Sequence, residues 1–141
     1  MAWDTQVESA ISGAAQRYGV DSKLMRAFAK IESGGRPNAR TGSYKGLFQL
    51  SDSEFGKYGG GNIYDPTANA AAAAQKLARE SATFKAKYGR DPAANDLYMI
   101  HQQGEGGYAA HSANPDAPAW QNMYSTGEGR KKGPGWAKAA I

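Results

Sequence analysis

The segment from Asp65 to Gly89 constrains the fold of this chain more than any other part of its sequence. Asp65-Pro66 places a capping residue before a proline at the first helical position, where the missing N–H is not needed. Alanine-rich sequence follows as far as Tyr88, and Gly89 is a typical helix end. The segment therefore predicts one long helix, and its small residues at 70–74 would let another helix approach closely. No segment alternates like a strand, so the predicted fold class is mainly α, with little or no β structure.

Two shorter helices are predicted towards the N-terminus. Thr5 and Glu8 form a capping-box pattern that starts the first helix, and Gly19 ends it. Asp21 caps the second helix, which stops at Ser33-Gly34-Gly35. The apolar residues at helical spacing that predict its buried face are Leu24, Met25, Phe28 and Ile31.

The remaining segments are shorter. The polar stretch 36–45 predicts a surface loop, after which Ser51 or Asp52 caps a brief helix. Asp91-Pro92 is expected to start another helix, and 118–124 to form one more. No internal repeat is visible.

The length of 141 residues fits one domain with a sizeable core. We assign residues 1–125 to this domain. Residues 126–141 are rich in glycine and lysine and are expected to form a flexible C-terminal tail.

Charge and composition exclude several functions. The net charge of +4 favours an anionic partner but is too small to choose among nucleic acid, anionic lipid and an anionic cell wall. No basic helix with interleaved aromatic residues supports nucleic-acid binding. The absence of cysteine excludes disulfides and thiol chemistry. His101 and His111 alone do not make a metal site, and we expect no metal or cofactor.

Membrane insertion is not expected, because no apolar run approaches the roughly 20 residues of a membrane-spanning helix. The N-terminal residues show no basic region followed by an apolar stretch, so no signal peptide is visible. The chain either starts in the cytoplasm or has lost a signal segment.

Glu32 is the residue that most strongly indicates a catalytic function. It lies in the last turn of the second predicted helix, beside the negative end of the helix dipole, which disfavours a charged carboxylate. Burial against Leu24, Phe28 and Ile31 would act in the same direction. A carboxyl group that stays protonated near neutral pH suits general acid catalysis, for example at a glycosidic bond.

Four motifs occur in the order typical of one protein family. They are Ile31-Glu32-Ser33, Gly46-Leu47-Phe48-Gln49, Asp65-Pro66-Thr67-Ala68-Asn69 and Ile100-His101-Gln102-Gln103-Gly104. Each motif is weak alone, but the series over about residues 7–110 resembles the lysozyme-like superfamily, specifically soluble lytic transglycosylases and goose-type lysozymes. The resemblance implies a single domain of two helical lobes around a glycan cleft.

The resemblance also implies an activity, namely cleavage of the MurNAc-β-1,4-GlcNAc bond of bacterial peptidoglycan. Glu32 would be the catalytic residue, first as general acid and then as base, giving an anhydro-muramyl product. The acetamido group of the substrate assists, so no second carboxylate is needed. A monomer acting on the cell wall, in the periplasm or outside the cell, is expected. A phage endolysin or a virion-associated muramidase is compatible with this resemblance, and so is a muramidase of a bacterial secretion system.

The residues expected to bind substrate are Ser33, Gly46, Gln49, His101 and Gln102. Of these, Gly46 could instead serve only a tight turn, and His101 could be a packing residue. His101 and Gln102 occupy positions where transglycosylases usually carry Tyr and Asn. This departure leaves a hydrolytic, goose-type lysozyme as an alternative. It also leaves open an inactive lysozyme-like module that binds glycan or protein.

Three polar residues near the motifs have structural interpretations. Asp52 and Glu54 are read as a helix cap and a first-turn charge rather than a second catalytic acid. Asn69 is expected to fix the start of its helix.

Overall fold

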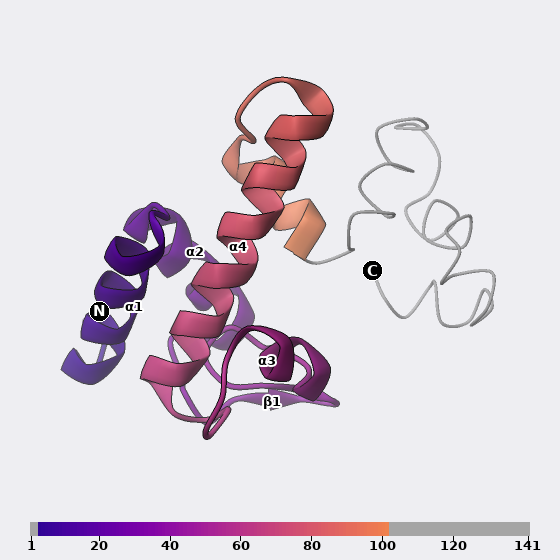
Figure 1. The fold of residues 1–141 in the computed structure, drawn as a ribbon. Coiled ribbons are helices and arrows are strands. Elements are labelled where there is room, and N and C mark those ends of the chain that lie inside the picture. The colour runs from indigo at the N-terminus through magenta and orange to yellow at the C-terminus, as the bar shows by residue number, and fades with distance from the viewer. Residues whose placement is uncertain (1–2, 102–141) are drawn as a thin grey trace. The chain divides into compact units, whose positions relative to one another are not determined.

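The computed structural model describes residues 3–101 (Figure 1). Its contacts divide the chain into two compact units, Met1–Lys87 and Tyr88–Ile141, which are described separately. The predicted helix at 118–124 and the predicted tail at 126–141 lie outside the described residues.

Helix α1 spans Thr5–Tyr18 and ends at Gly19, which adopts the left-handed conformation. Its N-cap is Asp4, whose carboxylate accepts a 2.8 Å hydrogen bond from the backbone N–H of Gln6. The predicted capping box of Thr5 and Glu8 is therefore wrong. The Glu8 side chain instead accepts a 3.1 Å hydrogen bond from the Arg26 guanidinium on the next helix.

Helix α2 spans Ser22–Ser33, with Asp21 as N-cap and Gly34 in the left-handed conformation at its end, as predicted. Met25 and Phe28 are buried and form the face that packs on α1 and the core. Ile31 was predicted to join this face, but its exposed fraction is 59%. Ser33, further along the same turn, is buried, so Ile31 is exposed because it lies on the opposite side of the helix from Ala29 and Ser33.

A short hairpin follows, where a plain loop was predicted. Strand β1, Arg40–Thr41, pairs antiparallel with β2, Tyr44–Lys45. An isolated bridge between Lys45 and Leu50 then continues the pairing. Two-residue strands carry no alternation that a sequence pattern could reveal.

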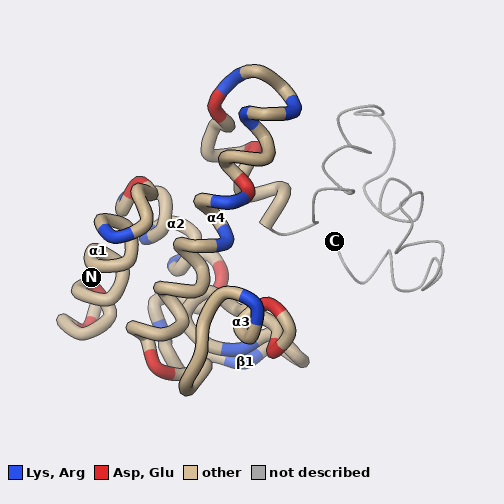
Figure 2. Tube along the Cα trace, in the orientation of Figure 1, with Lys and Arg blue, Asp and Glu red and all other residues tan. Residues whose placement is uncertain are grey.

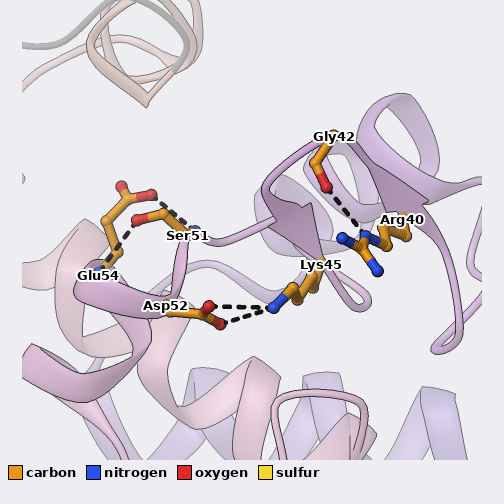
Figure 3. Close-up of polar contacts among 6 residues, drawn as sticks. All are labelled: Arg40, Gly42, Lys45, Ser51, Asp52 and Glu54. Carbon is orange, nitrogen blue, oxygen red and sulfur yellow. Dashed lines mark hydrogen bonds and ion pairs between the residues drawn. The ribbon is translucent and has the colours of Figure 1, made fainter.

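Helix α3 spans Asp52–Tyr58, and its N-cap is Ser51. The Ser51 hydroxyl accepts from the Glu54 backbone N–H at 3.1 Å, while the Glu54 carboxylate accepts from the Ser51 N–H at 3.0 Å. Figure 3 shows this reciprocal capping box beside the hairpin.

Helix α4 spans Pro66–Tyr88 and is the long helix that the sequence predicted. Asp65 caps it through a 3.3 Å hydrogen bond from the Thr67 backbone N–H. Most of its buried positions in the first half are alanine: Ala70, Ala72, Ala73 and Ala74. Figure 1 shows α3 and the hairpin gathered around the first half of α4.

The described part of the second unit contains one helix, at 94–101. It starts later than the predicted Asp91-Pro92. The Ala93 backbone N–H donates to the Asp96 carboxylate at 2.8 Å, so the helix is capped at Ala93 instead. Leu97 and Ile100 are buried. Among residues 3–101, no helix is long and apolar enough to cross a membrane.

Candidate active site

Glu32 lies in the last turn of α2 and is half-buried. Burial raises the pKa of the Glu32 carboxyl above its ordinary value, and the positive charge of Lys76 on α4 lowers it by a smaller amount. The net shift of the pKa is upward, which is the direction that the sequence predicted. A protonated carboxyl is what a general acid must present.

Ser33 connects the end of α2 to the Gly46–Gln49 motif. Its buried hydroxyl lies 2.7 Å from the Leu47 carbonyl oxygen, and the Ala29 carbonyl is slightly farther away, at 3.0 Å. The same oxygen accepts a 3.2 Å hydrogen bond from the Gly35 N–H. These contacts bring two of the predicted motifs together, although they are fourteen residues apart. They engage the hydroxyl within the protein, and substrate contact by Ser33 stays a prediction.

The Gly46–Gln49 segment forms a tight turn closed by paired backbone hydrogen bonds between Lys45 and Leu50, of 2.9 and 3.0 Å. Gly46 has φ +82°, a left-handed conformation that glycine adopts without strain. A Cβ at Gly46 would overlap the Asn69 amide and the Ile63 carbonyl oxygen. The turn therefore requires glycine here, and the buried side chains of Leu47 and Phe48 anchor it to the core.

Asn69 holds this turn on α4. Its side-chain oxygen accepts from the Phe48 N–H at 2.8 Å, and its amide nitrogen donates to the carbonyls of Ile63, at 2.8 Å, and Lys45, at 3.3 Å. The sequence predicted a local role at the start of α4. The structure adds a hydrogen bond to Phe48, in a segment more than twenty residues earlier in the chain.

Gln49 is the one predicted substrate-binding side chain in this unit with an unused polar atom. Its amide nitrogen donates to the carbonyls of Ala39, at 3.0 Å, and Gly46, at 2.8 Å. Both neighbours are acceptors, which fixes the orientation of the amide. The buried Oε1 atom has no donor among the described residues. Because this atom is covered by protein, substrate contact by Gln49 stays a prediction.

Comparison of the sequence with models of protein families identifies the family of this chain. The model described as "Transglycosylase SLT domain" matches residues 9–106, more than half of the chain. The chain belongs to the transglycosylase SLT domain family. This places it in the lysozyme-like superfamily and supports a general function in peptidoglycan degradation, of the lytic transglycosylase kind.

Two further acids lie near the turn of this SLT domain. Asp52 is largely exposed and pairs with Lys45, whose ammonium nitrogen is 3.0 and 3.1 Å from the two carboxylate oxygens (Figure 3). Burial raises the pKa of Glu54, but the charge of Lys76 and hydrogen bonds from Ser51 and Lys76 together lower it below its ordinary value. Glu54 is therefore a carboxylate with both oxygens in use, one with Ser51 and one with Lys76. These contacts give both acids structural roles, but the interpretation of Asp52 as a helix cap is wrong, because Ser51 caps α3 and Asp52 is its first residue.

The fourth motif of the SLT domain lies largely outside the described residues. His101 is partly exposed in the helix at 94–101 of the second unit. Gln102 is outside the described range. Their contacts with substrate stay predictions. Within residues 3–101, no three histidine, aspartate or glutamate side chains come together as metal ligands.

We expect Asp52→Asn and Glu54→Gln each to keep substantial lytic activity. Asp52→Asn removes a surface ion pair, which contributes at most about 1 kcal/mol. Glu54→Gln weakens a helix cap, at a cost of about 1 kcal/mol in the free energy of unfolding, and destabilises the protein further because the largely buried Lys76 loses a carboxylate partner. Turbidity clearing of purified peptidoglycan and thermal unfolding would measure both effects. A folded variant as inactive as a Glu32 variant would reveal a second catalytic acid and favour the hydrolase.

Proposed function

We propose that this SLT domain is a lytic transglycosylase that cleaves the MurNAc-β-1,4-GlcNAc bond of peptidoglycan, with Glu32 as general acid and then base. The observation that carries the proposal is the state of the Glu32 carboxyl. It is half-buried, its pKa is raised by that burial, and it adjoins the Gly46–Gln49 turn. The other two acids near the turn, Asp52 and Glu54, both serve in ion pairs.

The reaction would proceed in two proton transfers. Glu32 donates its proton to the glycosidic oxygen as the bond from that oxygen to C1 breaks, while the acetamido group of the muramyl residue stabilises the positive charge. The Glu32 carboxylate then takes the proton of the muramyl 6-hydroxyl, whose oxygen bonds to C1. The product is a 1,6-anhydro-muramyl end, and Glu32 is protonated again.

The surrounding residues would position the glycan. Gln49 is proposed to contact the glycan from the Gly46–Gln49 turn. Gly46 and Ser33 shape the turn beside Glu32, and His101 and Gln102 are proposed to contact substrate from the fourth motif. We further propose a monomer that acts on the cell wall, as a phage endolysin or virion-associated enzyme or as a secretion-system muramidase.

Mass spectrometry of digested peptidoglycan tests the proposal. Anhydro-muramyl ends are expected. Reducing ends would mean that water takes the place of the 6-hydroxyl and that the enzyme is a lysozyme. No cleavage, together with binding to peptidoglycan in a sedimentation assay, would identify an inactive glycan-binding module.

We expect lysis to weaken as salt is added. The chain carries a net charge of +4, and bacterial walls carry acidic peptide and polymer groups. Exposed charges attract one another only over about 8 Å at physiological ionic strength, and over less at higher salt. Initial clearing rates from low to high sodium chloride would measure the effect, and equal rates would show that net charge does not contribute to wall binding.

A further inference from the structure

Two exposed arginines lie in the segment that connects α2 to the Gly46–Gln49 turn. Each uses only its Nε atom in a hydrogen bond within the protein. Arg36 donates to the Ser33 carbonyl oxygen and Arg40 to the Gly42 carbonyl oxygen, both at 3.0 Å. Within residues 3–101, no carboxylate pairs with either guanidinium group. The segment therefore carries two positive charges that the described part of the chain does not neutralise.

The hydrogen bonds at Nε hold each guanidinium group in place. Because Nε lies at the base of this planar group, a bond there leaves the two terminal nitrogens as a two-pronged donor. Arginine uses this geometry to bind a carboxylate or a phosphate through two parallel hydrogen bonds. A side chain that is already held loses less freedom when a ligand binds.

Arg36 is attached to the end of the helix that carries the proposed catalytic acid. The carbonyl that holds its Nε belongs to Ser33, which follows Glu32 directly in the chain. The Ser33 hydroxyl in turn lies 2.7 Å from the Leu47 carbonyl oxygen, in the Gly46–Gln49 turn. A glycan bound beside Glu32 would therefore lie close to the Arg36 guanidinium.

Arg40 is attached to the same turn from the hairpin. It follows Ala39, whose carbonyl oxygen accepts a 2.8 Å hydrogen bond from the Gly46 N–H. In the hairpin, Arg40 lies directly opposite Lys45, so two positive side chains leave on the same face. Lys45 pairs with the Asp52 carboxylate, whereas the only partner of Arg40 in Figure 3 is a backbone carbonyl. Like charges opposite each other are destabilising, and an acidic ligand on Arg40 would relieve this repulsion.

The proposed substrate carries acidic groups in a suitable place. In peptidoglycan, short peptides with free carboxylates are attached to the lactyl group of the muramyl residue. A muramyl residue that is bound for cleavage therefore brings its peptide stem to the surroundings of Glu32. Phosphate-containing wall polymers are attached through the muramyl 6-hydroxyl, which the proposed reaction requires to be free. The observations thus favour a carboxylate of the stem over a phosphate.

We propose that Arg36 and Arg40 bind carboxylates of the peptide stem, so that the enzyme prefers glycan strands that carry peptides over bare strands. This inference rests on the proposed function, because that function places a muramyl residue beside Glu32. The alternative is purely structural. Arg36 would then only cap the negative end of α2, and Arg40 would only close the hairpin. In that case, loss of either side chain would change stability without changing which ligand the protein prefers.

The first readout is ligand binding to the full chain, followed by NMR titration. The probes are an N-acetylmuramyl tripeptide with free carboxylates, the same compound with its carboxylates amidated, and glycerol phosphate. None of them contains the bond that the enzyme would cut, so binding is measured without cleavage. The second readout is KM and kcat on soluble peptidoglycan strands, with their peptides and after removal of the peptides by an amidase.

The variants are Arg36→Gln, Arg40→Gln and Arg40→Lys, with Arg17→Gln as the matched control. Arg17 is exposed in the last turn of α1, and its loss changes the net charge equally. Arg40→Lys keeps the charge but removes the two-pronged donor. Thermal unfolding of each variant records any change in stability.

We expect Arg36→Gln and Arg40→Gln each to weaken binding of the acidic muramyl peptide about 5-fold, the upper range for an exposed ion pair. KM on strands with peptides should rise to a similar extent. Arg40→Lys should resemble Arg40→Gln. Binding of the amidated compound should change in none of the variants, and Arg17→Gln should bind both compounds like wild type.

Equal affinity of the wild-type protein for the acidic and the amidated compound would overturn the proposal. So would an Arg40→Gln variant that binds like Arg17→Gln, even if Arg36→Gln does not fold. Tighter binding of glycerol phosphate than of the acidic peptide would assign the arginines to wall polymers instead. Wild-type affinity in Arg40→Lys would show that charge alone suffices and would reject two-pronged binding.

The two readouts separate this proposal from the proposed function. Anhydro-muramyl products with an unchanged KM in both glutamine variants would keep the function and reject the arginine site. Weaker peptide binding by these variants in a protein that cleaves no peptidoglycan would keep the arginine site and reject the function.

Discussion

Glu32→Gln should reduce lysis by roughly 100-fold or more while leaving the fold intact, since general acid catalysis contributes about that much. The amide has the shape of the carboxyl group but no acidic proton to donate. Glu32 is half-buried at the end of α2, and within residues 3–101 its side chain makes no hydrogen bond that the substitution would break. The expected change is therefore in kcat rather than in stability.

Turbidity clearing and product analysis by mass spectrometry would measure the loss, with circular dichroism to verify the helical content. Asp52→Asn is the matched control, because it makes the same chemical change at an exposed acid that pairs with Lys45. Clearing by the Glu32 variant at a near wild-type rate would remove Glu32 from the catalytic role.

Gly46→Ala should lower the free energy of unfolding by about 3 kcal/mol or more and reduce activity with it. Alanine at φ +82° costs about 1–2 kcal/mol. Its methyl group would also displace the Asn69 amide, which makes three hydrogen bonds to backbone groups, each worth about 1 kcal/mol. The turn beside Glu32 would then lose its attachment to α4.

Urea or thermal unfolding would measure the change, and Gly13→Ala supplies the control. Gly13 lies in the middle of α1, and a Cβ there meets no atom within 4 Å. Alanine at this position should stabilise the protein by about 0.5–1 kcal/mol, because glycine is a poor helix former. Equal stability of the Gly46 variant and wild type would mean that the turn relaxes without Asn69.

The helices could be predicted because local chemistry starts and ends them. Asp21 and Asp65-Pro66 begin helices, and Gly34 and Gly89 take the left-handed conformation after them. The start of α1 was misplaced by one residue, because the preceding Asp4 accepts the capping hydrogen bond from the Gln6 N–H. The Glu8 side chain, which a capping box would need, bonds instead to Arg26 on another helix. A sequence window does not contain such a partner.

Of the candidate site, the sequence predicted the position of Glu32 at a helix end and its raised pKa. It did not predict how the site is held together. Asn69 reaches a turn twenty-one residues earlier, and Lys76 pairs with Glu54, which comes twenty-two residues earlier. Both contacts depend on how α4 packs against the other elements, which spacing along the chain does not encode.

The alanines of α4 have a consequence for mutagenesis. Ala70, Ala72, Ala73 and Ala74 are buried where this helix meets its neighbours, so the helix contributes backbone proximity there rather than large side chains. Truncation to alanine, the usual way to find important positions, leaves these four residues unchanged by definition. The stretch 70–74 of the helix would therefore look dispensable in an alanine scan. Substitution by valine or leucine, which would force the helices apart, is the experiment that would reveal how much depends on this close approach.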